Sequence, residues 1–432
     1  MGTQKLWRYE NGLLVMLFLA NGLMFFDRLA INFLMPFLRG EFSLSMVQIG
    51  LLNAALGVAW AISGFAFSQL TDRRAVKRPV LVSAVVVFSL CSISSGMAAT
   101  FAMLLLARVV MGLAEGPVLP VTQSLMMVES TPARRGFNMG FIQAVSTGVF
   151  GSMLAPVLLV FLAQEYGWRS TFYLAGIPGL VLAIVLWRWV REPSLERIAR
   201  AMPEAKVAAV SAAEGGRPLF NRNVLLCVVI ACLFITTFFS IMVFGPLFLV
   251  EQRKFTPGEM GMFMGVLGVS AVIGGALVPA LSDRLGRRPV LVFALLLTAL
   301  APLVVAVFQA SLPVLCAAIF ISYLGIGAFP VFLATIPGES VAGPYASRAI
   351  ALVVGAGEVV GGCVSPVLLG FSGDKLGAGT PFTIGCATAL IAALVALFLR
   401  ETAPSRVGAG RDSVVLLAER GPAAPLLDNE RS

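Results

Sequence analysis

Long apolar stretches alternate with short polar segments along most of the chain. A helix needs about 20 mainly apolar residues to cross a bilayer, and each of these stretches is long enough. The pattern therefore predicts an all-α membrane protein with twelve transmembrane helices. They are expected at residues 11–38, 46–70, 79–100, 101–129, 137–164, 170–190, 223–250, 257–281, 289–309, 312–336, 346–371 and 379–399.

Two polar segments are much longer than the others. Residues 191–222 contain three prolines and a run of small residues, and they separate the first six predicted helices from the last six. Residues 401–432 are rich in proline, glycine, alanine and charge, a composition typical of disorder. We therefore expect an N-terminal six-helix bundle at 1–190, a cytoplasmic linker at 191–222, a C-terminal bundle at 223–400 and a disordered cytoplasmic tail at 401–432.

The two predicted bundles share a repeated loop. The stretch GFAFSQLTDRRAVKRPVLV begins at Gly64, and GALVPALSDRLGRRPVLVF begins at Gly275. Each places an aspartate, Asp72 or Asp283, eight residues after the glycine, and the two aspartates are 211 residues apart. Each loop follows the second predicted helix of its half. Such a duplication favours a transporter whose halves rock about a central site.

The composition excludes a soluble protein. Of the 432 residues, 58% are hydrophobic and 12% are charged, whereas about 25% of the residues of an average soluble domain are charged. The chain has no histidine, and its six cysteines lie in apolar stretches without metal-ligand spacing. We therefore expect no metal site and no cofactor, and any proton chemistry must fall mainly to carboxylates.

The net charge of +9 reflects an uneven distribution of basic residues across the predicted membrane. When both termini are placed in the cytoplasm, the opposite side receives only Arg39, Arg169, Arg253, Lys254 and Lys375. This asymmetry agrees with the positive-inside rule, so the charge requires no nucleic-acid partner. Compact loops favour a multi-pass protein of a bacterial inner membrane, and we expect a monomer.

Four ionisable residues fall well inside the first and fourth predicted helices. Asp27 and Arg28 lie deep in the first, and Arg108 and Glu115 lie seven residues apart on one face of the fourth. A charge at the bilayer centre costs about 2.5–3.5 kcal/mol, so such residues face a cavity or a partner. We expect Arg28 and Arg108 to attract an anionic substrate and Asp27 and Glu115 to carry a coupled proton. A fixed ion-pair network between the two helices is the alternative.

Further polar residues of the predicted helices are candidate substrate ligands. They are Asn32, Gln123, Gln143, Tyr323 and Glu358, the last an intramembrane carboxylate among glycines. A lone neutral polar residue at such a position more often makes a hydrogen bond between helices than a contact with substrate.

The repeated loops resemble the signature of the major facilitator superfamily, and the resemblance covers about residues 11–400. It implies a fold of two six-helix pseudo-repeats that provide access to each side of the membrane in turn. It also implies that charged residues of the loops bias one conformational state. These gating candidates are Asp72, Arg73, Asp283, Arg284 and Arg288.

Within the superfamily, three stretches resemble the anion:cation symporter group, which includes permeases for organic acids and sugar acids, and the spinster-type transporters. They are FFDRLAINFLMPFLRGEFSLS, ARVVMGLAEGPVLP and GWRSTFYLAGIPG. The leading expectation is therefore a proton-coupled transporter of a small organic anion. A proton-antiport exporter of drugs, lipids or metabolites is the alternative. We do not expect an enzyme, because the chain has no histidine and no recognisable cysteine or serine motif. The absence of a GxxxxGK phosphate loop argues against ATP-driven transport by this chain alone.

Overall fold

The computed structural model describes residues 2–73, 76–131, 134–194, 221–341, 343–403 and 406. Within these ranges, ten helices are long and apolar enough to cross a membrane. One of them, Arg135–Trp189, is 55 residues long and is divided at Gly167, where φ is +79°. Thr380–Ala396 is a shorter apolar helix. With the divided helix counted as two, the structure has the twelve membrane segments that the apolar pattern predicts.

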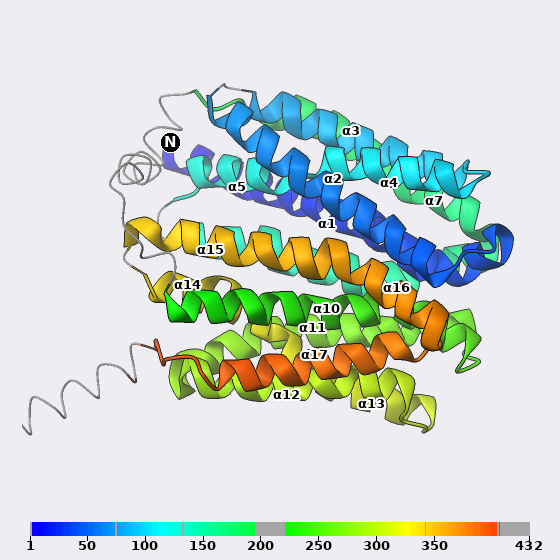
Figure 1. Ribbon diagram of the computed structural model, residues 1–432. Helices are drawn as coiled ribbons and strands as arrows, with labels where there is room; N and C mark the ends of the chain where they lie inside the picture. The colour runs from blue at the N-terminus through cyan, green and yellow to red at the C-terminus, as the bar shows by residue number, and fades with distance from the viewer. Residues whose placement is uncertain are drawn as a thin grey trace, which may run out of the picture.

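The first six segments form one bundle (Figure 1). The fourth and fifth segments are each built from more than one helical piece, and the sixth is the part of α7 after Gly167. The elements in order are α1 (Gly2–Phe42), α2 (Met46–Arg73), α3 (Lys77–Gly96), α4 (Phe101–Glu115), α5 (Val118–Glu129), α6 (Arg135–Gly140), η2 (Phe141–Val145), η3 (Thr147–Leu154) and α7 (Ala155–Trp189).

The last six segments form the second bundle (Figure 1). Here the tenth and eleventh segments are divided. The elements in order are α10 (Arg222–Glu251), α11 (Pro257–Leu285), α12 (Arg287–Ala306), α13 (Leu312–Tyr323), η5 (Leu324–Ala328), η6 (Val331–Thr335), α14 (Ile336–Glu339), α15 (Gly343–Gly357), η7 (Glu358–Val364), α16 (Ser365–Leu376) and α17 (Thr380–Ala396). Most of the predicted linker and tail lies outside the described residues.

The breaks within segments recur at related places in the two halves. α4 gives way to α5 at Gly116 and Pro117, and α13 gives way to the 3₁₀ turn η5. Pro120 and Pro330 follow these breaks and stand 210 residues apart. Proline removes a backbone donor and clashes with the preceding turn, so the repeated prolines explain why corresponding segments bend.

The two halves are joined mainly at the end of the molecule opposite the N-terminus (Figure 1). Arg39, near the end of α1, forms an ion pair with Glu251 at the end of α10. Asp374 of α16 accepts hydrogen bonds from the backbone N–H groups of Met46 and Val47, at 2.9 and 3.0 Å. Asp374 therefore caps the start of α2 across the interface.

Small residues bring the backbones of the two halves together at this end. A Cβ atom added to Gly50 of α2 would lie 2.2 Å from the carbonyl oxygen of Pro366 in α16. One added to Gly268 of α11 would lie 2.1 Å from the carbonyl oxygen of Ser152 in η3. At the opposite end, among the described residues, α5 makes no comparable contact with α14 or α15. We call the tightly joined end the closed end.

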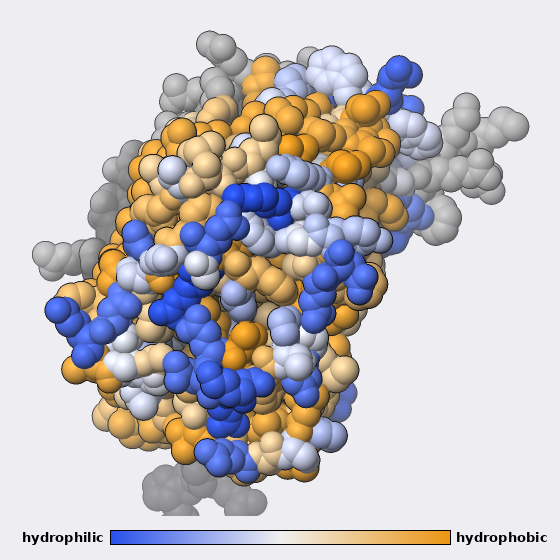
Figure 2. Space-filling view, turned by 90° about the vertical axis from the view of Figure 1, so that its right-hand side faces the viewer, coloured by the Kyte–Doolittle hydropathy of each residue, from blue (hydrophilic) through white to orange (hydrophobic). Residues whose placement is uncertain are grey.

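The surface of the closed end differs from that of the flanks. Figure 2 views the molecule from this side and shows hydrophilic residues spread across it, with hydrophobic residues around its margins. Along the helices, many large apolar side chains are exposed, among them Phe65, Ile184 and Phe293. Water-facing ends and apolar flanks are what a bilayer-spanning bundle requires.

Two glutamates tie the last helix of each half to its third helix. Glu192 accepts hydrogen bonds from the first two backbone N–H groups of α3, at 2.8 and 2.7 Å. Glu401 accepts them from the first two of α12, at 2.7 and 3.1 Å. A carboxylate satisfies the unpaired N–H groups at a helix start and interacts favourably with the helix dipole. In each half, a glutamate therefore attaches the chain segment after the last helix to the start of the third helix.

Replacing Glu401 by glutamine is expected to lower the free energy of unfolding at pH 7 by about 1 kcal/mol, which lowers the unfolding midpoint by a few degrees. Burial alone would raise the pKa of the Glu401 carboxyl, but hydrogen bonds from four backbone N–H groups hold this pKa below its usual value. A pKa that is lower in the folded protein gives stabilisation that is present at neutral pH and is lost as the pH falls through it.

The stability difference between Glu401→Gln and the unmodified protein should therefore shrink below about pH 4. Thermal unfolding in detergent at pH 7 and at low pH measures both differences. Glu165→Gln, which changes an exposed carboxylate, is the control and should have little effect. A Glu401→Gln difference that is the same at both pH values would contradict this role.

Candidate functional site

The ionisable residues predicted to share a site meet in the interior of the N-terminal half. Asp27 of α1, Arg108 of α4 and Glu115 of α4 have exposed fractions of 1%, 1% and 0%. Apolar side chains that include Met24, Met111 and Phe88 form the buried core of this bundle. With Arg28 of α1, we call Asp27, Arg108 and Glu115 the charge cluster.

Few direct contacts hold the charge cluster together. The hydroxyl of Ser92 in α3 donates to Asp27 Oδ1 at 3.1 Å. Arg108 Nη1 donates to the backbone carbonyl of Arg28 at 3.2 Å. Glu115 interacts electrostatically with Arg28 and Arg108, and Asp27 with Glu115 and Arg108. α1, α3 and α4 therefore each contribute to one electrostatic unit.

Several polar atoms of the charge cluster are buried without a hydrogen-bond partner among the described residues. They are Asp27 Oδ2, Arg108 Nε and Nη2, and both carboxylate oxygens of Glu115. No ion pair within 4.0 Å joins these side chains in the described part of the chain. A buried polar atom without a hydrogen-bond partner costs about 1–3 kcal/mol. An arrangement with this cost is typical of ionisable side chains that bind a ligand or a proton in another state of the protein.

Arg28 connects the charge cluster to the second half. Its guanidinium lies 5.2 Å from the ring centre of Trp60 and 5.8 Å from that of Phe25. Unlike the other three members it is half-buried, and it also interacts electrostatically with Glu358 of η7. The Glu358 carboxylate lies close to Gly362, where an added Cβ would be 2.7 Å from Oε2. Arg28 thus interacts electrostatically with a carboxylate from each half, Glu115 and Glu358.

The remaining predicted ligands, among the described residues, form no hydrogen bond with the charge cluster. Asn32 is fully buried and accepts a hydrogen bond from the side-chain amide of Asn53, at 3.0 Å. Gln123 donates to Gln143 at 3.0 Å, which links α5 to η2. Tyr323 is buried in the second half, and its hydroxyl has no partner among the described residues. A direct role for these four residues in binding stays a prediction.

The second repeated loop is organised around Arg287. Its guanidinium donates to the two carboxylate oxygens of Glu339 at 2.8 and 3.3 Å, and to the hydroxyl of Ser282 at 2.8 Å. It also forms an ion pair with Asp283. The hydroxyl of Thr402 donates to Glu339 at 2.7 Å. These contacts tie the ends of the eighth, ninth and tenth segments together within the second half.

The other predicted gating residues contribute less to these contacts. The side chains of Arg284 and Arg288 are exposed. Asp72 and Arg73 end α2, and their side chains lie outside the described residues. Lys77 and Glu129 stand 210 residues before Arg287 and Glu339, and Lys77 is fully buried. The gating role of the five predicted residues stays a prediction, and Arg287 joins them as a candidate.

Three residues of the site were not predicted. Ser92, Trp60 and Phe25 contact members of the charge cluster. Phe25 is two residues before Asp27 in sequence, but serine and tryptophan inside an apolar stretch give no signal of their own. In the described ranges, no three carboxylates or cysteines are placed to hold a metal ion.

Comparison with known proteins identifies the fold family. Residues 17–285 and 256–427 match the Major Facilitator Superfamily. The chain belongs to this superfamily. It is therefore a membrane transporter, not an enzyme, built from two six-helix pseudo-repeats as the repeated loops predict.

Three similar proteins illustrate the relationship. A probable 4-methylmuconolactone transporter of Cupriavidus pinatubonensis is 29% identical over 93% of this chain and 92% of its own length. The cis,cis-muconate transport protein of Acinetobacter baylyi is 25% identical over 87% of this chain and 91% of its own. A bacterial homologue of the human lysosomal transporter spinster, solved in an inward-facing and unoccupied conformation, has a TM-score of 0.67 at 19% identity over 96% of this chain and 99% of its own.

Proposed function

We propose that this superfamily member is a proton-coupled symporter that imports a small organic anion bearing a carboxylate. The relatives named for muconate and methylmuconolactone transport support an organic-acid substrate. We further propose that it is a monomer in a bacterial inner membrane with both termini in the cytoplasm, as the distribution of basic residues indicates. The closed end then faces outward, and the structure represents an inward-facing state.

The observation that carries the proposal is the charge cluster buried without direct ion pairs. A structural network would require the arginines and carboxylates to satisfy one another, because unpaired buried charges are strongly destabilising. Instead, both oxygens of Glu115 and two nitrogens of Arg108 lack partners among the described residues. This supports groups whose partners change during the cycle, a proton at the carboxylates and an anion at the arginines.

Arg28 is the residue best placed to receive the substrate. It is the most exposed member of the charge cluster, and it interacts electrostatically with Glu115 of the first half and with Glu358 of the second. A guanidinium can bind a carboxylate through two parallel hydrogen bonds. Trp60 and Phe25 next to it would pack against an unsaturated or aromatic carbon skeleton.

The cycle follows from competition for the arginines. In the outward-facing state a proton neutralises Glu115, so that Arg28 and Arg108 lose a carboxylate neighbour and attract the anion. The bound anion screens Arg28 from Glu358, and the two halves rock to the inward-facing state. There the anion leaves, Glu115 releases its proton and again interacts with the arginines. Binding of the anion and protonation of Glu115 thus favour each other.

Uptake by purified protein in proteoliposomes tests the proposal. Radiolabelled cis,cis-muconate and a panel of mono- and dicarboxylates are presented with and without an imposed pH gradient, inside alkaline. We expect the gradient to raise accumulation of at least one carboxylate. The exporter alternative predicts instead that hydrophobic amines, and not carboxylates, exchange in a counterflow assay.

Arg28→Gln is expected to raise the KM for the transported carboxylate by tenfold or more, since one charge-assisted interaction of about 1.5–3 kcal/mol is lost. Arg28→Lys should restore part of the affinity by keeping the charge. Lys254→Gln, which removes an exposed charge, controls for attraction of the anion by the protein surface. An unchanged KM in Arg28→Gln would remove Arg28 from the binding site.

A further inference from the structure

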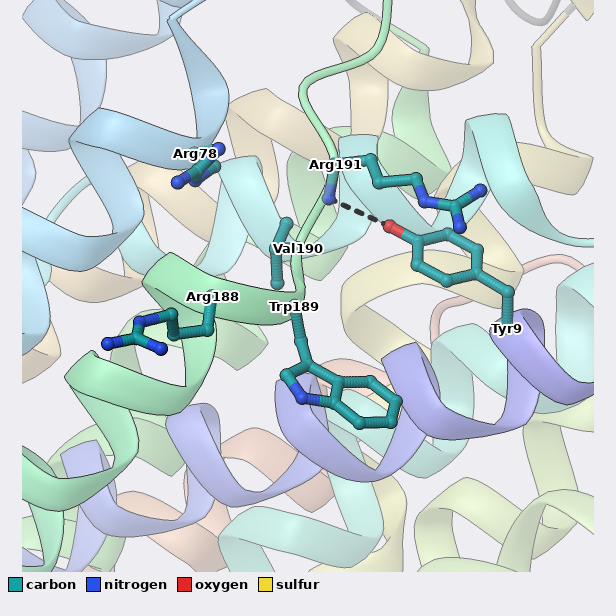
Figure 3. Close-up of a pocket in the computed structure, with 6 residues that line it drawn as sticks. All are labelled: Tyr9, Arg78, Arg188, Trp189, Val190 and Arg191. Atoms are coloured by element: carbon teal, nitrogen blue, oxygen red, sulfur yellow. Dashed lines mark hydrogen bonds between the residues drawn. The ribbon is translucent and has the colours of Figure 1, made fainter.

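A cavity lies away from the charge cluster, at the end of the molecule that holds the N-terminus. Its volume is about 430 Å³. Figure 3 shows its lining, which comes from α1, α3 and the end of α7 with the residues that follow it. The lining residues are Tyr9, Arg78, Arg188, Trp189, Val190 and Arg191. Half of them are arginines, so the cavity is strongly basic.

No carboxylate among the described residues forms an ion pair with these arginines. Arg78 stacks on the ring of Trp187 at 4.3 Å and donates one Nη–H to the Trp187 carbonyl. Its Nε is buried without a partner among the described residues. The guanidinium of Arg191 lies 4.8 Å from the ring centre of Tyr9, so aromatic contacts position both cations without neutralising them.

The carboxylate nearest in sequence, Glu192, offsets only part of this positive charge and forms no ion pair with the three arginines among the described residues. Glu192 directs its two oxygens at the backbone N–H groups that begin α3, at 2.8 and 2.7 Å. The hydroxyl of Tyr9 accepts a hydrogen bond of 2.9 Å from the backbone N–H of Arg191. Figure 3 marks this bond with a dashed line. The backbone around the cavity is therefore fixed, and three arginines beside one carboxylate leave a net positive charge for a ligand.

The cavity lies at the boundary between apolar and polar surroundings. Trp187 and Trp189 are 51% and 64% exposed on either side of the exposed Arg188. Tryptophan is enriched where a membrane protein meets the headgroup layer. Basic pockets at this level on the cytoplasmic side bind anionic headgroups, and the predicted topology places this cavity on that side.

The second half repeats the cluster only in part, since Arg288 stands 210 residues after Arg78. Arg400 stands 209 residues after Arg191, but Leu397 and Phe398 stand where Arg188 and Trp189 would be. Positive-inside bias acts on both halves, so it does not explain why three arginines and the aromatic residues gather around one cavity only.

We propose that this cavity binds the phosphate group of an anionic ligand, with Arg78, Arg188 and Arg191 as its ligands. The phosphate comes either from an anionic glycerophospholipid of the facing leaflet or from a soluble phosphate compound. Arginine suits phosphate because its planar fork donates two parallel hydrogen bonds. The proposal does not depend on which anion is transported.

Thermal unfolding in a neutral detergent tests the site on the full chain. The probes are phosphatidylglycerol and cardiolipin, phosphatidylcholine as a zwitterionic lipid, and inorganic phosphate and glycerol 3-phosphate as soluble compounds. The variants are Arg188→Gln, the triple change of Arg78, Arg188 and Arg191 to glutamine, and the triple change to lysine. Arg288→Gln combined with Arg400→Gln is the matched control in the second half.

We expect an anionic probe to raise the unfolding midpoint by about 3 °C or more and phosphatidylcholine to have no such effect. Arg188→Gln should reduce the shift, the glutamine triple variant should abolish it, and the lysine triple variant and the second-half control should keep most of it. A shift with the lipids alone identifies the membrane as the source, and a shift with the soluble compounds identifies a soluble ligand. Equal shifts in Arg188→Gln, the glutamine triple variant and the unmodified protein, or no shift with any probe, would overturn the proposal.

Discussion

Glu115→Gln is expected to abolish accumulation of the anion against its gradient while leaving counterflow exchange largely intact. Glutamine keeps the size and polarity of the buried side chain, but it does not ionise. The anion still reaches Arg28 and Arg108, whereas the proton no longer has a carboxylate to occupy at this position. One proton moved with each monovalent anion supports about tenfold accumulation per pH unit. Under a gradient of one pH unit, accumulation by Glu115→Gln should therefore be at least about tenfold lower.

Two comparisons make this result specific. Asp27→Asn should separate accumulation from exchange in the same way, because Asp27 and Glu115 interact with the same Arg108. Glu165→Gln changes an exposed carboxylate and should transport normally. Full proton-driven accumulation by Glu115→Gln would reject its coupling role.

Gly50→Leu is expected to separate the two halves at the closed end and to reduce transport at least tenfold. A Cβ at Gly50 would lie 2.2 Å from the carbonyl oxygen of Pro366 and 2.6 Å from its carbon. Backbone atoms do not move aside as a flexible side chain does, so α2 and α16 must separate. Overpacking of this kind costs about 1–3 kcal/mol, which is enough to shift the balance of two conformations by about tenfold or more.

Spin labels on the two halves measure this shift. In a cysteine-free background, labels at Met97 and Val307, both exposed, should report longer distances in Gly50→Leu. Gly275→Leu is a matched control, because nothing lies within 4 Å of a Cβ added to this membrane-helix glycine. Transport and distances that remain unchanged in Gly50→Leu would show that the closed end is not held by this contact.

The fold could be predicted almost completely from the apolar pattern, because a bilayer imposes segment length and helical structure together. The pattern also places the division near Gly167, in the polar stretch 164–170 between the predicted fifth and sixth helices, where a positive φ makes the turn. A repeated Arg-Glu pair in the sequence marks the end of each half. The pairs Arg191-Glu192 and Arg400-Glu401 follow the last helix of each half, and both glutamates cap a helix.

The charge cluster could be predicted because buried charges are rare in membrane helices and must lie together or face a cavity. The neutral residues that contact it, Ser92 and Trp60, could not be found this way, since neither residue is unusual inside an apolar stretch. The pairing of Arg287 with Glu339 depends on how segments 52 residues apart pack. Which of several loop arginines is buried is a property of packing, and residue type alone does not specify it.

Proton movement that accompanies anion entry tests the central claim most directly. Proteoliposomes that contain the protein and an internal pH-sensitive dye receive the carboxylate that gives uptake in the panel assay, without an imposed pH gradient. The proposed mechanism predicts that entry of the anion acidifies the interior, and that Glu115→Gln removes the acidification. Entry of the carboxylate with no change in internal pH would contradict proton-coupled symport by this protein.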